Sequence, residues 1–322
     1  MKILFILDPI EKLSWHWDNS LYLAREFLKR GHHVGSADIP DLLFENRTPK
    51  AFVRPLAASS LPYKGQKIQD RYGFKKTKAN LEDLTKFDLV LIRKEPPFDS
   101  HYLAMTHLLD LLPKRIRVVN SPSGLRTMNE KLCILKYPDL IPRTCVSNSA
   151  AQIIHFQKKI QSDIVVKPLD QKGGKGVILI PFKHKAAESI VRKSSGSGKR
   201  FLMAQERLLH SEKLPEKRII LLEGRVLSLY GKRPIKNEFR ANLDLGSAFF
   251  PAELDRHDKT IISRLKPELK AQGIHFAGLD ILGGKLLEVN VTCPAGISEA
   301  KHLYPKLALV EAWANSLEAL CS

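Results

Sequence analysis

Cysteine is scarce in this sequence, and its spacing argues against disulfide or metal chemistry. The chain has 322 residues and only four cysteines, which stand far apart at Cys133, Cys145, Cys293 and Cys321. Zinc sites and redox motifs use closely spaced cysteine pairs, and disulfide frameworks belong mainly to short secreted chains. The pattern therefore indicates reduced thiols and a cytoplasmic protein.

Long hydrophobic runs are also absent. A transmembrane helix needs about 20 consecutive apolar residues, and no segment approaches that length. The apolar run Ile3–Leu7 is too short for the hydrophobic part of a signal peptide, and no cleavage site follows it. We interpret it as a buried first strand, and no membrane partner is expected.

Acidic residues are too few to balance the basic ones. The sequence has 34 Asp and Glu against 52 Lys and Arg, which gives a formal net charge of +18. Part of the excess lies in Lys64–Lys78 and Lys183–Arg200. A positive field attracts anions such as nucleic acids or nucleotide triphosphates. Because no aromatic–basic motif is present, specific nucleic-acid binding is not expected, and most of these side chains are interpreted as a solvated surface.

Strands and helices alternate through the first 120 residues. The expected elements are a strand at 2–7, a helix at 19–30 capped by Asp18 or Asn19, a strand from Val34, a strand at Phe87–Arg93, a helix from Asp99 and a strand at Arg117–Asn120. This order predicts an α/β lobe of Rossmann-like type, with helices on both faces of a parallel sheet. Residues 45–80 are polar, basic and short on periodicity, and we interpret them as a long excursion.

The pattern changes near residue 121. The expected elements are a helix starting at the capping box Thr127–Glu130, a helix over Ser147–Ile160, strands over Asp163–Pro168, Phe201–Glu206 and Lys217–Leu222, and helices near 255–272 and 305–319. Residues 231–250 are rich in charge and poor in pattern. We therefore expect three domains, at 1–120, 121–203 and 204–322.

Residues 278–292 are predicted to form a β-hairpin that turns at a Gly-Gly pair. Side chains alternate along a strand, so Glu288 and Asn290 share one face, and a three-residue connection over 283–285 would place Asp280 opposite Glu288. Such oxygen ligands suit Mg²⁺, which commonly also binds substrate phosphates. The alternative is a solvated hairpin whose acidic residues face water, and spacing alone does not decide between the two. The opposite face is expected to be packed by Leu279, Ile281, Leu287, Val289 and Val291.

A lysine at the end of a predicted strand is followed directly by a glycine-rich loop. The segment Ile164–Gly176 contains Lys167 and then the loop residues Lys172–Gly176. Glycines let backbone N–H groups approach an anion, so such loops hold phosphates, although an ordinary turn has the same composition. The Walker motif and the dinucleotide fingerprint are missing. Together with Lys131 and the acidic hairpin, the loop favours a site for a metal-bound triphosphate.

In order and spacing, these motifs resemble those of the prokaryotic glutathione synthetases, members of the ATP-grasp superfamily. The resemblance covers nearly the whole chain and is carried by Leu7–Ile10, Arg93–Asp99, Val119–Pro122, Asn129–Leu132, Val166–Asp170, Gly173–Gly174, Met203–Gln205, Lys217–Arg218, Gly278–Asp280 and Glu288–Thr292. It implies that the N-terminal lobe is followed by a two-lobed ATP-grasp fold. It also implies an ATP-dependent ligase that joins γ-glutamylcysteine to glycine through an acyl phosphate, releasing ADP and phosphate.

The resemblance also implies roles for residues at matching positions. For ATP these are Lys131, Lys167, Lys172, Gly173 and Gly174 at the phosphates, Gln205, Glu206 and Leu208 around adenine, and Glu216 at the ribose. Mg²⁺, with Mn²⁺ as the alternative, would be bound by Asp280, Glu288 and Asn290. The acyl phosphate and the tetrahedral intermediate would be stabilised by Arg218, Arg233 and Arg240, because guanidinium groups fork onto phosphate oxygens. The peptide substrate would contact Asp18, Ser20, Arg93 and Asn290.

Three departures from the family pattern concern the substrate side. The loop Arg233–Gly246 has lost most of the family's glycines, Cys293 and Ala295 replace hydroxyl residues, and Trp17 stands where a lysine is usual. These departures keep open an ATP-grasp ligase that acts on a different peptide or amino acid. A non-catalytic nucleotide-binding relative is a further alternative. The resemblance also suggests a homo-oligomer.

Overall fold

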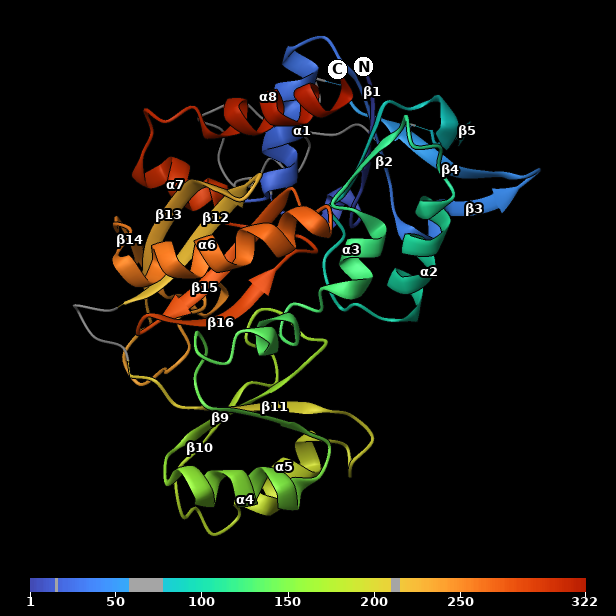
Figure 1. Cartoon of the computed structure of the whole chain (residues 1–322). Helices are drawn as coiled ribbons and strands as arrows, with labels where there is room; N and C mark the ends of the chain where they lie inside the picture. Colours follow the sequence, from blue (N-terminus) through green and yellow to red (C-terminus); the bar gives the residue numbers. More distant parts are fainter. Residues whose placement is uncertain (15–16, 58–77, 210–214) are drawn as a thin grey trace.

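The computed structural model describes residues 1–14, 17–57, 78–209 and 215–322. Within these ranges the chain forms three sheets that follow one another along the sequence, and in Figure 1 the third sheet lies between the first and the second. Most of the basic segment Lys64–Lys78 lies outside the described residues, as does Trp15 of the segment that contains Trp17.

The first sheet confirms the predicted parallel lobe. Its elements are β1 (Lys2–Ile6), α1 (Asn19–Lys29), β2 (His33–Ala37), β3 (Leu42–Glu45), β4 (Thr48–Pro55), β5 (Asn80–Asp83), β6 (Leu89–Ile92), α2 (Ser100–Asp110) and β7 (Arg117–Val119). Strands β2, β1, β6 and β7 are parallel neighbours. Ile3 and Phe5 pack in the cluster that contains the α1 residue Phe27, whereas Leu4 and Ile6 pack in the cluster of α2. Strand alternation therefore supplies a hydrophobic layer to helices on both faces.

The first part of the expected excursion over 45–80 has regular strand structure. Strands β3 and β4 form an antiparallel hairpin, and β5 pairs with Lys50–Val53 on the other edge of β4. Along β4, the buried Pro49, Ala51 and Val53 alternate with more exposed residues. Asn46 and Arg47 make the turn with φ of 51° and 68°. The period-two signal was present, but it was short and surrounded by polar residues.

The predicted helix start at Thr127–Glu130 was wrong. Helix α3 (Pro122–Thr127) ends there instead, after beginning at Ser121, whose hydroxyl accepts a hydrogen bond from the Gly124 N–H. Proline at the first helical position and a serine cap favour this earlier start. Asn129 then caps a short turn by accepting hydrogen bonds from the N–H groups of Lys131 and Leu132.

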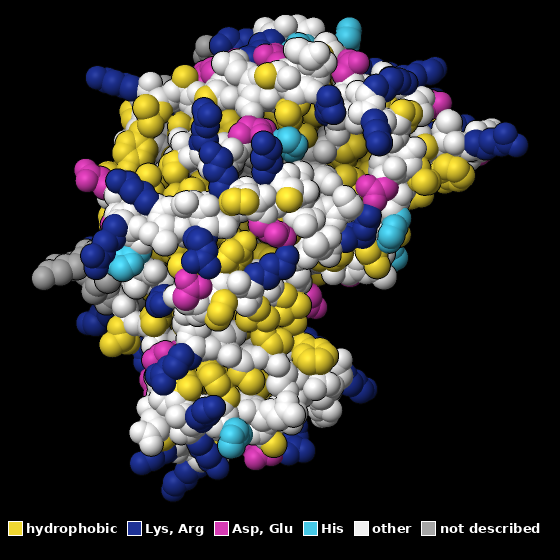
Figure 2. Space-filling view, in the orientation of Figure 1, with side chains coloured by type: hydrophobic (Ala, Val, Ile, Leu, Met, Phe, Trp, Pro, Cys, Tyr) yellow, Lys and Arg dark blue, Asp and Glu magenta, His cyan; other side chains and the backbone are white. Residues whose placement is uncertain are grey.

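The second sheet belongs to a small lobe with two helices on its outer face (Figure 1). Its elements are β8 (Thr144–Ser147), α4 (Ala150–Ile160), β9 (Ile164–Pro168), β10 (Ile178–Ile180), α5 (Ala187–Ser194) and β11 (Leu202–Glu206), and the strand order is β10-β9-β11-β8. The glycine-rich loop connects β9 to β10. Lys and Arg side chains cover much of the lobe's outer end in Figure 2. Those of Lys183–Arg200 are exposed, as expected for a solvated surface.

The third sheet carries the acidic hairpin. Its elements are β12 (Glu216–Leu222), β13 (Arg225–Arg233), β14 (Ala248–Phe250), α6 (Arg256–Ala271), β15 (Phe276–Leu282) and β16 (Lys285–Asn290), followed by α7 (Ile297–Leu303) and α8 (Leu309–Cys321). The strand order is β14-β13-β12-β15-β16. The charge-rich residues 231–250 contain strand structure at both ends, because β13 continues to Arg233 and β14 ends at Phe250. In the described part of the chain, no helix is long and apolar enough to cross a membrane.

Helix α8 returns to the first lobe and packs beside α1, so the two ends of the chain are neighbours (Figure 1). Trp313 of α8 belongs to the same buried cluster as Ile3 and Phe27. Arg30 and His32 each lie 2.7 Å from the Glu318 carboxylate. The C-terminal helix therefore completes the core of the N-terminal sheet.

Candidate functional site

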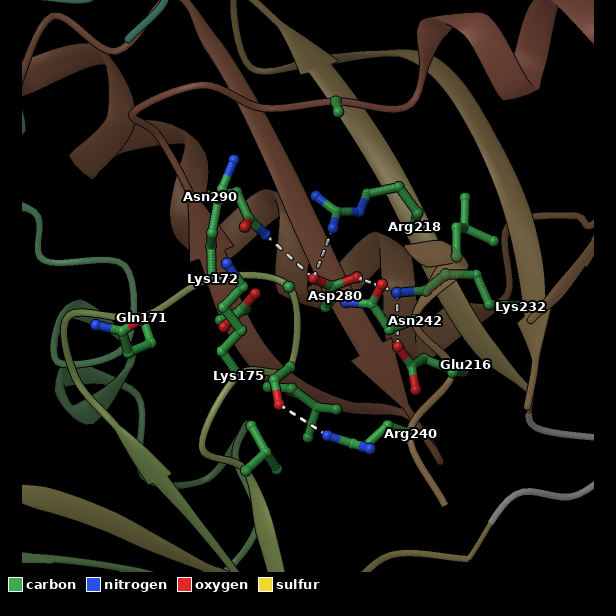
Figure 3. A pocket seen from close by; sticks show the side chains of 18 of the residues that line it. Gln171, Lys172, Lys175, Glu216, Arg218, Lys232, Arg240, Asn242, Asp280 and Asn290 are labelled. Atoms are coloured by element: carbon green, nitrogen blue, oxygen red, sulfur yellow. Dashed lines mark hydrogen bonds and ion pairs between the residues drawn. The ribbon is translucent and has the colours of Figure 1, made fainter. Parts of the chain in front are cut away.

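A cavity of about 1300 Å³ opens between the three sheets. The N-terminal lobe contributes Asp18 and Arg93, the small lobe contributes Lys167 and the glycine-rich loop, and the third sheet contributes Asp280. Side chains from distant parts of the sequence converge in it (Figure 3). A cavity of this size, with charged groups of both signs, is the expected form of a site for a nucleotide and a second substrate.

The hairpin at the cavity wall confirms that Asp280 lies opposite Glu288. The turn has two residues rather than three, and a bulge between Asp280 and Ile281 restores the register. The bulge changes the packing, because Leu286 is buried in the core whereas Leu287 lines the cavity. The expectation that Leu287 packs the opposite face was therefore wrong.

Asp280 is surrounded by nitrogen donors. Arg218 Nη2 lies 3.1 Å from its Oδ2, Lys232 Nζ lies 2.8 Å from its Oδ1, and Asn290 Nδ2 donates a hydrogen bond of 3.1 Å to Oδ2. Burial acts to raise the pKa of Asp280, but the charges of Arg218 and Lys232 outweigh it and hold that pKa well below its usual range. The carboxylate is therefore ionised at neutral pH.

The donor chemistry of this wall fits a hard cation. Two carboxylates, Asp280 and Glu288, and the amide of Asn290 face the cavity from adjacent strands. Among the described residues no group of three His, Cys, Asp or Glu could hold a metal ion, so the set depends on the amide oxygen of Asn290. Oxygen ligands in such small number are typical of sites that Mg²⁺ shares with substrate phosphates.

Two buried lysines stand across from the acidic wall. Lys131 Nζ donates to the Gln171 carbonyl at 2.8 Å and lies 3.6 Å from the Glu288 carboxylate. Lys167 Nζ donates to the Leu287 carbonyl at 3.4 Å. Burial lowers the pKa of Lys167, and the nearby Glu288 charge opposes that shift. Because both lysines are buried, they would attract an anion such as phosphate more strongly than surface lysines do.

The glycine-rich loop is held from both sides of the cavity. Gly173, Gly174 and Gly176 have φ of 65°, 70° and 70°, a left-handed conformation that glycine adopts without strain. Lys172 Nζ forms an ion pair of 2.6 Å with Glu95 of the N-terminal lobe. Arg240 Nη1 donates to the Gly174 carbonyl at 3.0 Å (Figure 3). The loop thus meets both other lobes.

The three arginines with predicted catalytic roles have different positions. Arg218 is partly buried in the cavity wall, and its Nε, which is itself buried, has no hydrogen-bond partner within the described ranges. Arg240 lines the cavity but is clamped by Glu238, which accepts from its Nε and Nη2 at 3.0 and 2.7 Å. Arg233 is exposed, stacks on the Phe250 ring and does not line the cavity. The structure therefore brings Arg218 and Arg240 to the site and leaves Arg233 outside it.

The segment that connects the small lobe to the third sheet contains the residues expected around adenine. Gln205, Glu206 and Leu208 line the cavity. The Gln205 amide donates to the Thr144 hydroxyl at 3.2 Å, and the Glu206 carboxylate accepts two hydrogen bonds from Arg143. Because these side-chain groups are already paired, adenine recognition here would depend mainly on backbone groups.

The residues expected at the peptide substrate cluster at the N-terminal lobe. Arg93 is buried, lies over the rings of Phe276 and Trp313, and donates from Nε to the Ser20 hydroxyl at 3.0 Å. Ser20 does not line the cavity, so it orients Arg93 from behind, whereas Asp18 does line it. Burial raises the pKa of the Cys293 thiol, which also lies in this wall.

Two residues that the sequence reasoning missed are central to the site. Lys232 joins Asp280 to Glu216, whose Oε1 is 2.6 Å from its Nζ. The Glu130 carboxylate accepts from the N–H groups of Val291 and Thr292, which fixes the strand end after Asn290. The signal for Lys232 was the hairpin turn at Glu223–Gly224. With β13 recognised as its second strand, Lys232 falls opposite Glu216, on the face of the sheet that lines the cavity.

The chain is similar to known proteins over nearly its whole length. The model of the prokaryotic glutathione synthetase N-terminal domain matches residues 1–126, and that of the ATP-grasp domain matches residues 130–305. A glutathione synthetase of Synechococcus elongatus is 36% identical over 305 residues, covering 94% of each chain. One of Nitrosomonas europaea is 35% identical over 301 residues, covering 93% of this chain and 92% of the relative. The crystal structure of a D-cycloserine synthetase shares the fold, with a TM-score of 0.66 and 16% identity over 98% of this chain and 99% of its own.

Proposed function

Since the chain belongs to the prokaryotic glutathione synthetase family, we propose that it joins γ-glutamylcysteine to glycine and converts ATP to ADP and phosphate. The observation that carries this proposal is the cavity itself. Buried Lys131 and Lys167 lie across from the hairpin residues Asp280, Glu288 and Asn290. Cations for phosphates and oxygen ligands for a metal are thus present in one space, as ATP-dependent activation of a carboxylate requires.

We assign Mg²⁺ to Asp280, Glu288 and Asn290, with Mn²⁺ as the alternative. Their oxygens are of the type that both ions accept. When bound, the ion would neutralise negative charge on the transferring phosphoryl group. Lys131, Lys167 and the loop Lys172–Gly174 would hold the phosphates, and Glu216 the ribose.

The donor carboxylate becomes reactive once it is joined to the γ-phosphoryl group. We assign Arg218 to this step because its guanidinium lines the cavity beside Asp280, where a cation would stabilise a developing negative charge. Arg240 supports it indirectly, because it attaches the loop around Glu238 to the Gly174 carbonyl over the cavity. A covered cavity protects an acyl phosphate from water until the amine attacks.

The N-terminal lobe would bind the peptide. Buried Arg93 suits a substrate carboxylate, because a guanidinium fixed by stacking and by Ser20 loses little freedom on binding. Asp18 suits an ammonium group. We also propose a cytoplasmic location, from the scattered reduced cysteines, and a homo-oligomer, which light scattering coupled to size-exclusion chromatography would measure.

The test is an ADP-release assay with ATP, Mg²⁺ and γ-glutamylcysteine, with and without glycine. Glycine-dependent release together with formation of glutathione supports the proposed reaction. ADP release that requires a different amine, or a different peptide donor, would show that the protein is a carboxylate–amine ligase with other substrates. Absence of release with every donor and amine tested would favour a nucleotide-binding protein without ligase activity.

A further inference from the structure

Lys232 is a buried cation of the site to which the sequence motifs give no role. It lies on β13, directly opposite Glu216 in the β12–β13 pairing, and is 7% exposed. Its Nζ is 2.6 Å from Glu216 Oε1 and 2.8 Å from Asp280 Oδ1. It therefore bridges the residue assigned to the ribose and a residue assigned to the metal (Figure 3).

The position of Lys232 conflicts with metal binding at Asp280 in the absence of nucleotide. One Asp280 oxygen contacts the ammonium of Lys232, and the other contacts Arg218 and Asn290. A divalent cation at this carboxylate would meet two positive charges at short range, in a buried place where such repulsion is strong. The metal can therefore bind Asp280 well only after a cation has moved.

Glu288, on the neighbouring strand, is held less tightly than Asp280. Its side chain is 24% exposed, and Lys131 Nζ lies 3.6 Å away, beyond hydrogen-bond distance. The two carboxylates of the wall therefore differ, since Glu288 is accessible to a metal and Asp280 is occupied by Lys232.

We propose that Lys232 is an internal cation that keeps divalent metal away from Asp280 until a nucleotide binds. A lysine ammonium has three N–H donors on a flexible stem, and the described contacts use two of them, to Glu216 and Asp280. Phosphate oxygens arriving beside the ammonium would take it from Asp280 and free the carboxylate for the metal. Metal and nucleotide then bind cooperatively. This inference rests on the proposed nucleotide site.

The test is Mn²⁺ binding to the full chain, followed by electron paramagnetic resonance with and without ADP. The informative variant is Lys232→Met/Glu216→Gln. It removes both charges of one buried pair and leaves Asp280 with Arg218, so no buried carboxylate lacks a cationic partner. The matched controls are Glu216→Gln, which keeps the ammonium group of Lys232, and Lys232→Arg, which keeps a positive charge at position 232. Calorimetric unfolding verifies that each variant is folded.

We expect the double variant to bind Mn²⁺ without nucleotide about tenfold more tightly than the wild type, because the positive charge of Lys232 no longer lies beside Asp280. ADP should strengthen Mn²⁺ binding in the wild type and also in Glu216→Gln, which lacks the carboxylate assigned to the ribose, and much less in the double variant. The two controls should bind Mn²⁺ alone no more tightly than the wild type. Equal Mn²⁺ affinity of wild type and double variant would overturn the inference. Failure of the wild type to bind ADP at all would instead refute the proposed nucleotide site.

Discussion

Lys217, the other buried lysine of the third sheet, should stabilise the protein without contributing to the site. It is next to Glu216 on β12 but points to the opposite face, towards α6, as strand alternation requires. Its Nζ lies 2.6 Å from Asp258 Oδ2, 3.0 Å from Asp255 Oδ2 and 3.0 Å from the Glu253 carbonyl. Asp258 is fully buried. The substitution Lys217→Met would leave the Asp258 carboxylate without a cationic partner.

The size of the effect follows from these distances. At an effective dielectric constant of about 20, opposite charges 2.6 Å apart attract by about 6 kcal/mol, most of which offsets desolvation. Breaking one side of a buried pair costs about 3–5 kcal/mol, because the other charge stays buried. For 322 residues, an unfolding entropy of about 2.1 cal/mol/K per residue converts this loss into a fall in Tm of about 4–7 °C.

Differential scanning calorimetry at pH 7 measures this change. The matched control is Lys136→Met, which breaks an exposed ion pair of the same 2.6 Å length with Glu268, also on α6. An exposed pair contributes little, so the control should stay within about 1 °C of the wild type. Affinity for ADP should be unchanged in Lys217→Met. A Tm equal to that of the control would refute the reasoning from burial.

The contact of Lys217 with its second carboxylate partner, Asp255, predicts a pH dependence. Burial acts to raise the pKa of Asp255, but backbone hydrogen bonding at Asp258 and the contact with Lys217 outweigh it and lower that pKa. A carboxylate with a lowered folded-state pKa contributes stability above its unfolded value of about 3.9, and this contribution disappears as the pH falls through the folded value. The Tm difference between wild type and Lys217→Met should therefore be constant from about pH 5 to 8 and shrink below about pH 4.

Three further predictions concern the site. Glu288→Gln should reduce ligase turnover at least about a hundredfold while folding stays intact, and full turnover in a steady-state ADP assay would remove Glu288 from the metal set. The KM for ATP should rise as the pH approaches 10, because Lys167, whose pKa is lowered by burial, loses its charge before an ordinary lysine does; a pH-independent KM up to that point would contradict a phosphate contact. Arg240→Ala should lower kcat/KM about tenfold and speed proteolysis of the loop around Glu238, since the hydrogen bond to Gly174 is lost; unchanged proteolysis would show that this bond does not hold the loop.

Local sequence patterns were sufficient for much of the fold. The alternation of apolar strands with capped helices predicted the parallel lobe, because burial on both faces requires nearly continuous apolar strands. The Asp18 and Asp99 caps are present, each accepting hydrogen bonds from the first turn of its helix. The pairing of Asp280 with Glu288 was also predicted correctly. Local patterns were insufficient where the signal was short, as at β3–β4, or where a competing start signal, Ser121-Pro122, came first.

The sequence by itself determined which chemical groups are available: lysines, a glycine-rich loop and oxygen-bearing side chains on one hairpin face. Only the tertiary structure decided which of them meet. Lys232 rather than Arg233 faces the cavity, because side chains alternate and β13 extends as far as Arg233. Lys217 and Lys232 are both buried lysines with two carboxylate partners, yet one supports α6 and the other lies between Glu216 and Asp280. Contacts of this kind join residues far apart in the chain, so their partners depend on packing that no local pattern records.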